Sequence, residues 1–186
     1  YQAGEDSAFE VFQNFLKEDI FRYHARRDFP AIEGTSRLSP YLALGVISVK
    51  TLLQEALMIN EGDFHAGDEG ILTWMNELYW REFYYHIMWN FPQVSRNRAF
   101  QEKTENIQWR ENETDFEAWK NGETGIPIVD AFMRQLKTTG WMHNRGRMIT
   151  AMFLTKNLLI DWRKGEAWFM LNLIDGDFAA NNGGWQ

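Results

Sequence analysis

The stretch from Trp74 to Tyr85 reads W-M-N-E-L-Y-W-R-E-F-Y-Y, and it is the most informative part of the chain. On a helix, Glu77, Trp80, Arg81 and Tyr84 stand at spacings i, i+3, i+4 and i+7, which is one face. That face combines a carboxylate, an indole, a guanidinium and a phenol. A packed core does not need an acid and a cation between stacking rings, whereas a pocket for a flat, polar, aromatic ligand does. The stretch therefore predicts a long helix that carries part of a binding site.

The composition indicates one helical domain or a large part of one. The chain has 186 residues and 45% hydrophobic content, and its 16% aromatic content with 9 Trp suggests stacking surfaces as well as packing. No apolar run is long enough for a membrane span, and no secretory signal opens the chain. The absence of cysteine excludes disulfides and thiolate metal sites and fits a reducing compartment, so we expect a cytoplasmic protein without a metal site.

The net charge of −7 argues against a general nucleic-acid binder, which normally has a basic excess. Local charge matters more than the sum, however, and arginines occur in small groups. These groups are Arg26 and Arg27, Arg37, Arg96 and Arg98, and Arg145 and Arg147. A basic patch on an acidic body therefore remains possible.

Apolar residues recur every three to four positions over most of the chain, which predicts helices nearly throughout. No segment alternates cleanly enough to require a strand. We expect an all-α fold in one domain, residues 1–186, that continues beyond both ends in a longer protein. The expected helices cover about 9–23, a segment from Ser39-Pro40 to about 57, about 70–90, 115–120, 127–139, 144–159 and 166–174.

Three polar segments could bind a ligand. Residues 35–40, T-S-R-L-S-P, place hydroxyls and a cation before a helix start, which suits a phosphate but equally suits a capped helix with a solvated Arg37. In residues 140–148, Asn144, Arg147 and Met148 share a helix face and could meet a base and phosphates. The alternative for that segment is an ordinary helix start with Asn144 near its cap.

The third segment, residues 175–185, contains two acids, two amides and three glycines between its aromatic and small residues. It could be a ligand loop or a set of caps and turns, and a calcium loop is disfavoured because the final Glu is missing. On spacing alone, Trp109, Trp162 and Trp185 would be core residues.

Taken together, these motifs resemble the flavin-binding helical domain of the DNA photolyase and cryptochrome family, over essentially the whole chain. The motifs are Tyr23 with R-D-F-P at 27–30, E-G-T-S-R-L-S at 33–39, residues 74–83, T-G-I-P-I-V-D at 124–130, residues 141–148 and residues 175–185. The resemblance implies an all-α FAD-binding domain truncated at its C-terminus, with the N-terminal α/β antenna domain missing. An antenna folate or deazaflavin is expected only in that missing domain.

The resemblance also implies the residues that hold a U-shaped FAD. Those expected near its pyrophosphate are Tyr23, Thr35, Ser36, Arg37, Leu38 and Ser39. Those expected around the flavin are Trp74, Arg81, Arg147, Asp175, Gly176, Asp177 and Asn181. Arg147 would pair with Asp175, and Asn181 would face the central nitrogen of the flavin, where an amide can hydrogen-bond either redox state.

The residues implied for repair come from several of the same segments. Glu77 would hydrogen-bond the damaged bases, Trp80 would stack on them, and Asn144 and Met148 would complete the pocket. Asn181 completes this catalytic set. Arg27 and Arg145 would contact the DNA backbone, whereas Trp109, Trp162 and Trp185 would pass electrons from the surface to the flavin.

The implied function is light-driven repair of cyclobutane pyrimidine dimers in ultraviolet-damaged DNA, a carbon–carbon lyase reaction driven by excited reduced FAD. Photolyases are among the known base-flipping enzymes, so the resemblance implies that the lesion leaves the duplex. Two other functions stay open: a cryptochrome-type FAD photoreceptor without repair activity, and a helical module without a cofactor. No membrane and no obligate protein partner are expected.

Overall fold

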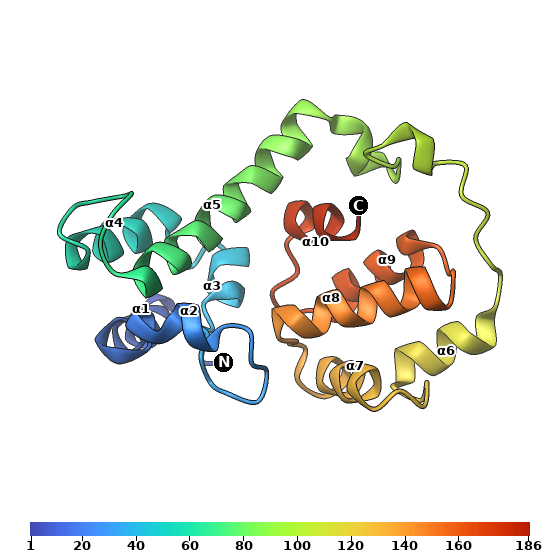
Figure 1. The fold of residues 1–186 in the computed structure, drawn as a ribbon, viewed down its shortest axis with the longest axis horizontal. Coiled ribbons are helices and arrows are strands. Elements are labelled where there is room, and N and C mark those ends of the chain that lie inside the picture. Colours follow the sequence, from blue (N-terminus) through green and yellow to red (C-terminus); the bar gives the residue numbers. More distant parts are fainter. The chain divides into compact units, whose positions relative to one another are not determined.

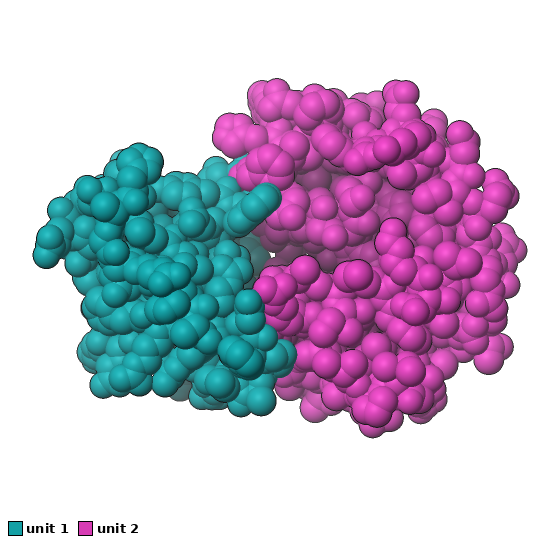
Figure 2. All heavy atoms as spheres, in the orientation of Figure 1, with its two compact units in different colours: residues 1–82 teal, residues 83–186 magenta.

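The computed structural model describes all residues from Tyr1 to Gln186, and its regular elements are all helical (Figure 1). The prediction of an all-α fold is therefore confirmed. The chain divides into two compact units, Tyr1–Glu82 and Phe83–Gln186, which Figure 2 colours separately. The boundary between the units lies inside one long helix. That the whole chain forms a single domain stays a prediction.

Unit 1 begins with an almost unbroken helical segment, as the apolar spacing predicts. A π-helical turn and a 3₁₀ turn interrupt its regular hydrogen bonding without ending it. A loop follows, and then two helices and the first part of the long helix. The elements are α1 (Glu5–Asn14), the π turn (Phe15–Asp19), the 3₁₀ turn (Ile20–Arg22), α2 (Tyr23–Arg26), α3 (Ser39–Ala43), α4 (Val49–Ile59) and α5 (Glu69–Asn90).

The core of unit 1 is aromatic around Trp74, which is only 3% exposed. Its indole stacks on Phe12 at 5.7 Å between ring centroids and lies 5.4 Å from Phe15. Leu52 and Ile71 complete the buried cluster from α4 and α5. Aromatic pairs of this kind stabilise a core beyond the area they bury, so α5 is fixed against α1 in this unit.

The expectation of one helix from Ser39 to about residue 57 is wrong. The structure has α3 and α4, separated by a turn over residues 44–48. The Ser48 side chain accepts a hydrogen bond from Lys50 N at 3.2 Å and thereby starts α4 anew. Ser39, which we expected to cap, is itself the first residue of α3, and no side chain caps that helix.

Unit 2 starts within α5 and contains the remaining helices. Two short 3₁₀ turns lie between α5 and α6. The elements after α5 are the 3₁₀ turns Pro92–Arg96 and Glu102–Thr104, α6 (Glu113–Asn121), α7 (Pro127–Thr139), α8 (Asn144–Met152), a π turn (Phe153–Asn157), α9 (Trp162–Asn172) and α10 (Phe178–Trp185).

The core of unit 2 is built around Trp119, which is completely buried. Its ring lies between Phe116 and Phe169, each 5.9 Å away and nearly parallel to it. The indole N–H donates to the carbonyl of Thr150 at 3.0 Å, so the polar atom of this core residue has a partner. These contacts join α6, α8 and α9.

Two helix starts in unit 2 differ from the expectation because aspartates cap them. Asp161 accepts from Arg163 N at 3.0 Å, so α9 begins four residues before the expected Glu166. Asp177 accepts from Ala180 N at 3.0 Å and starts α10 in a segment that we expected to be a loop. The structure has no group of three or more His, Asp or Glu side chains that could hold a metal ion.

No helix combines the length and the apolar character that crossing a membrane requires.

Candidate cofactor and DNA site

The expected DNA-contacting residues of unit 1 are brought together at α2 and α5. Arg27 Nη1 lies 2.6 Å from Glu77 Oε1, although the two residues are 50 positions apart in the chain. The Arg27 guanidinium also lies over the Tyr23 ring, 5.3 Å from its centroid. Burial and the nearby Glu77 carboxylate raise the pKa of Tyr23 far above its ordinary value, so its phenol is neutral.

Trp80 and Arg81 lie one turn further along α5. Trp80 is 55% exposed. Arg81 Nη2 donates to the carbonyl of Leu42 at 3.5 Å, and its Nη1 lies 3.4 Å from Glu82 Oε1. The predicted helical face from Glu77 to Arg81 is therefore present on an unbroken helix.

The expected pyrophosphate segment of unit 1 is a partly exposed loop that leads into α3. Leu38 is buried at 1% exposure and anchors the loop in the core, whereas Ser39 is exposed and Thr35 and Ser36 are half-buried. Arg37 has a left-handed φ of 56°, a backbone conformation uncommon for residues with a side chain. The cofactor roles of these residues, of Tyr23 and of the core residue Trp74 stay predictions.

Unit 2 contains a cavity of about 600 Å³ between α8, α9 and α10. This volume lies within the range of small-molecule and cofactor sites. The cavity brings together nine of the residues that we expected in a site, and three of them are the tryptophans whose proximity spacing could not establish. The nine are Trp109, Asn144, Arg147, Met148, Trp162, Asp175, Asp177, Asn181 and Trp185.

Arg147 and Asp175 form an ion pair at the cavity, as expected. Arg147 Nη2 lies 2.6 Å from Asp175 Oδ2, and its Nε donates to the carbonyl of Met142 at 2.9 Å. The Asp175 side chain is 1% exposed. Its second oxygen, Oδ1, is buried without a hydrogen-bond partner. A buried acceptor of this kind is costly unless a donor satisfies it.

The Asn181 amide is held by the protein on both sides. Its Nδ2 donates to the side chain and the backbone carbonyl of Glu166 at 3.0 and 3.1 Å, and its Oδ1 accepts from Trp185 Nε1 at 3.2 Å. Burial raises the pKa of Glu166, while the bond from Asn181 partly opposes that rise. Asn181 is therefore oriented by a buried acid and by an expected electron-transfer residue.

Two further contacts fix α10 within unit 2. Asp177, which caps α10, accepts through Oδ2 from the Tyr85 hydroxyl at 2.5 Å. The Trp185 ring packs onto Gly165 of α9, where an added Cβ would come within 2.3 Å of the indole. The carboxylate of Asp177 thus has protein partners at both oxygens, and its expected contact with a cofactor, like that of the neighbouring Gly176, stays a prediction.

The start of α8 gathers the expected lesion-contacting residues of unit 2. Asn144 Nδ2 and Arg145 Nη1 lie 4.0 and 3.7 Å from Met148 Sδ. Met148 is 45% exposed. The helix is capped by His143, whose Nδ1 accepts from Arg145 N at 3.1 Å, and not by Asn144. This bond gives His143 a structural role.

Several residues at or behind the cavity were not predicted from the sequence. Glu166, which accepts from the cavity residue Asn181, gave no signal because a carboxylate in a helix is normally solvated. Lys156 and Thr155 were missed because a π turn places them there, and such turns are rare. Tyr84 was placed on the correct face of α5 but was given no role.

A cavity of this size, lined by tryptophans, amides and an Arg–Asp pair with a buried aspartate, suits a flat aromatic cofactor. Comparison with known proteins gives the family. Residues 74–186 match the model described as the FAD binding domain of DNA photolyase. The chain belongs to this family, and FAD is the cofactor of the domain.

Three similar proteins illustrate the match. The chain is 53% identical over 174 residues to a deoxyribodipyrimidine photo-lyase of Vibrio cholerae, covering 94% of this chain and 37% of that protein. It matches a solved class III photolyase from Agrobacterium tumefaciens with a TM-score of 0.93 and 42% identity, covering 100% of this chain and 38% of that one. A Synechocystis cryptochrome gives a TM-score of 0.91 and 35% identity, with coverages of 100% and 38%.

The chain thus spans less than two fifths of the length of these relatives. The residues around the cavity fit the cofactor of the family. The unpartnered Asp175 Oδ1 would accept from an N–H group of the ligand, and tryptophan rings would pack beside a flat aromatic ring system.

Proposed function

We propose that this chain supplies the catalytic domain of a light-driven enzyme that splits cyclobutane pyrimidine dimers in DNA. The observation that carries the proposal is the cavity of unit 2, in which the three expected electron-transfer tryptophans meet the Arg147–Asp175 pair. The name of the Vibrio cholerae relative, at 53% identity, agrees with this reaction.

The chemistry of the lesion explains why these residue types suit it. A cyclobutane dimer has no leaving group, so hydrolytic residues would be useless, and one added electron is enough to weaken the ring. FAD supplies that electron when it is bound, reduced and illuminated. The task of this chain is therefore to bind, to orient and to exclude water.

Both units contain residues that we propose to contact the damaged DNA. In unit 1, Trp80 would stack on the extruded bases and Glu77 would hydrogen-bond them, with Arg27 holding the Glu77 carboxylate in place. In unit 2, Asn144 and Met148 would contact the lesion, and Arg145 would contact a phosphate. Damaged DNA is the proposed partner, and the cytoplasm is the proposed compartment.

The experiment uses the complete protein that contains this chain, loaded with reduced FAD. An oligonucleotide that carries one thymine dimer is mixed with the protein and illuminated with blue light, and the restored thymines are counted by chromatography. Repair that needs both light and reduced FAD supports the proposal. Intact dimers after illumination would reject it.

The second candidate is a cryptochrome-type photoreceptor, which the similarity to the Synechocystis cryptochrome favours. A photoreceptor needs photoreduction of FAD through the tryptophans but does not need lesion contacts. Under this alternative, blue light reduces bound FAD while the dimer substrate stays unchanged. Measuring both quantities on the same sample separates the two functions.

A further inference from the structure

Arg163 directly follows Trp162 at the start of α9, and its guanidinium lies over the Trp162 ring at 4.8 Å from the centroid. Trp162 is only 7% exposed and lines the cavity of unit 2. A guanidinium over an indole face is attracted by the electrons of the ring. No role was assigned to Arg163 from the sequence.

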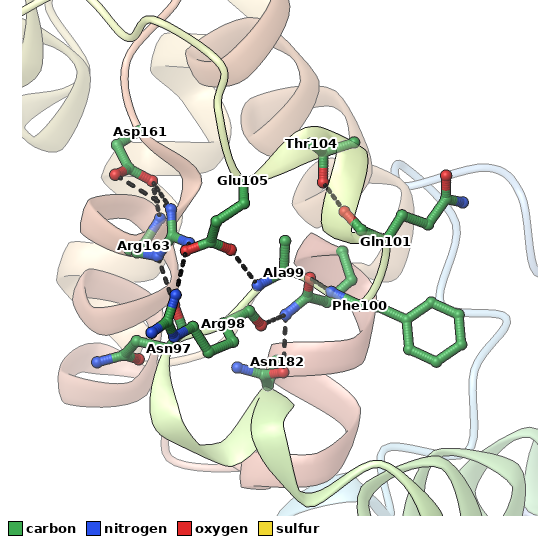
Figure 3. A network of polar contacts seen from close by, with 11 residues as sticks. Asn97, Arg98, Ala99, Phe100, Gln101, Thr104, Glu105, Asp161, Arg163 and Asn182 are labelled. Atoms are coloured by element: carbon green, nitrogen blue, oxygen red, sulfur yellow. Dashed lines mark hydrogen bonds and ion pairs between the residues drawn. The ribbon is translucent and has the colours of Figure 1, made fainter.

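Three other groups hold the Arg163 guanidinium in this position (Figure 3). Its Nη2 lies 3.0 Å from Glu105 Oε1, its Nη1 lies 3.3 Å from Asp161 Oδ1, and its Nε donates to the carbonyl of Asn97 at 2.7 Å. A planar guanidinium bonded along its edges cannot rotate away from the ring without losing these bonds. Arg163 is therefore a fixed charge beside Trp162.

The electrostatic consequence concerns the charge of the indole. A neutral ring is stabilised by the cation, but a ring that has lost an electron is positive and is repelled by it. The carboxylates of Glu105 and Asp161 offset part of this repulsion. The hydrogen bond from Ala99 N and the nearby arginines lower the pKa of Glu105, so its carboxylate is ionised. Arg98 Nη1 lies 3.7 Å from Glu105 Oε1, so two arginines and two carboxylates set the charge in this region, and the Arg163 guanidinium lies over the Trp162 ring.

We propose that Arg163 is a positioning residue for electron transfer that makes Trp162 harder to oxidise, so that positive charge moves on to Trp109. This inference rests on the proposed function. Under that proposal, Trp185 would give one electron to the bound flavin, and Trp162 and then Trp109 would each replace the electron lost by the tryptophan before it. A thiol in solution would return one electron to Trp109 and release its proton to the buffer, and two of the resulting thiyl radicals would combine to a disulfide.

The test compares three variants of the complete FAD-loaded protein by transient absorption after a blue flash. The measured quantity is the yield of tryptophan radical that survives the fast return of the electron. R163Q removes the cation, so the charge rests on Trp162 near the flavin, and we expect the yield to fall about tenfold. R163K keeps the charge but loses the planar group that is bonded along its edges, so its yield should lie between that of R163Q and that of the parent protein. E105Q removes an opposing charge and should leave the yield equal or higher.

The opposite directions of R163Q and E105Q separate electrostatics from structural damage, because damage would lower the yield in both. A common fall, or an unchanged yield in R163Q, overturns the proposal. Urea unfolding of each FAD-free variant checks that the fold is retained, and it needs no photochemistry. W162F tests whether electrons pass through Trp162. A parental radical yield in W162F rejects this route and with it the proposal, whereas loss of the yield supports the route on which Arg163 is proposed to act.

Discussion

Arg147 and Asp175 form a 2.6 Å ion pair in which the arginine side chain is 26% exposed and the aspartate side chain only 1%. The pair joins α8 to the segment before α10, 28 residues further along the chain. Because the aspartate is the buried partner, the two residues are not equivalent for stability. Removing the arginine leaves a buried charge, whereas removing the aspartate leaves a cation that can reach water.

We therefore expect R147M to lower the free energy of unfolding by about 3 kcal/mol, because the Asp175 carboxylate then has no counter-charge. D175N should cost clearly less. Urea unfolding followed by circular dichroism measures both. The double variant R147M/D175N is the control, and it should recover part of the loss. A double variant as unstable as R147M would contradict this reading of the pair.

Neighbouring glycines in α10 should respond in opposite directions to alanine. A Cβ at Gly183 would lie 2.2 Å from Tyr84 Cδ1, whereas a Cβ at Gly184 meets nothing within 4 Å. G183A must displace the tyrosine ring and should cost about 1–3 kcal/mol. G184A should stabilise by about 0.5 to 1 kcal/mol because alanine favours the helix. Thermal unfolding of the two variants measures the difference, and equal shifts would rule out the close approach of Tyr84.

The raised pKa of Glu166 makes stability depend on pH. The folded state holds the proton more tightly than the unfolded state, so the contribution of this group is complete below the ordinary glutamate pKa. That contribution is lost as the pH rises through the higher folded-state pKa. E166Q lacks this loss and keeps an oxygen that can accept from Asn181.

The measurement is urea unfolding of E166Q and of the parent chain from about pH 4 to about pH 8, roughly the range over which a raised glutamate pKa acts. The difference between their free energies of unfolding isolates Glu166, because the contributions of the other titrating groups cancel. We expect this difference to shift in favour of E166Q as the pH rises. A difference that is constant with pH would show that Glu166 keeps the same affinity for protons in both states.

Stacking on Trp80 should make a measurable contribution to the affinity for damaged DNA. W80A removes the exposed indole and should weaken binding of a dimer-containing oligonucleotide by about 1–3 kcal/mol, the usual contribution of one stacked base. Tyr79 provides the matched control, since it is 42% exposed on the same helix but lies off the predicted face. Fluorescence anisotropy with the complete protein measures both variants. Equal losses in W80A and Y79A would mean that the predicted face does not bind the lesion.

Apolar spacing predicted most helices, because a helix that buries one face has apolar residues every three to four positions. The match is closest for α7, which spans Pro127–Thr139 as expected, with proline at its first position and Gly140 directly after its end. The same method failed for α10, whose glycines and amides look like a loop. There, one aspartate cap and the packing of Gly183 against Tyr84 outweigh the low helix propensity of glycine.

The site was predictable residue by residue only where a motif resembles the family. Pairings between distant positions could not be predicted from spacing, and they decide the chemistry of individual groups. Arg27 with Glu77 is separated by 50 residues, and Arg163 with Glu105 by 58. A spacing rule covers one helix turn or one strand repeat, so it carries no information about such contacts.

The contact between the Trp185 indole and Gly165 has a consequence for the speed of charge movement. Electron tunnelling slows steeply with every ångström between donor and acceptor. Any side chain at position 165 would push the indole outward, since an added Cβ would come within 2.3 Å of it. A residue that has no side chain would then set the tunnelling distance from Trp185, although it takes no part in the reaction.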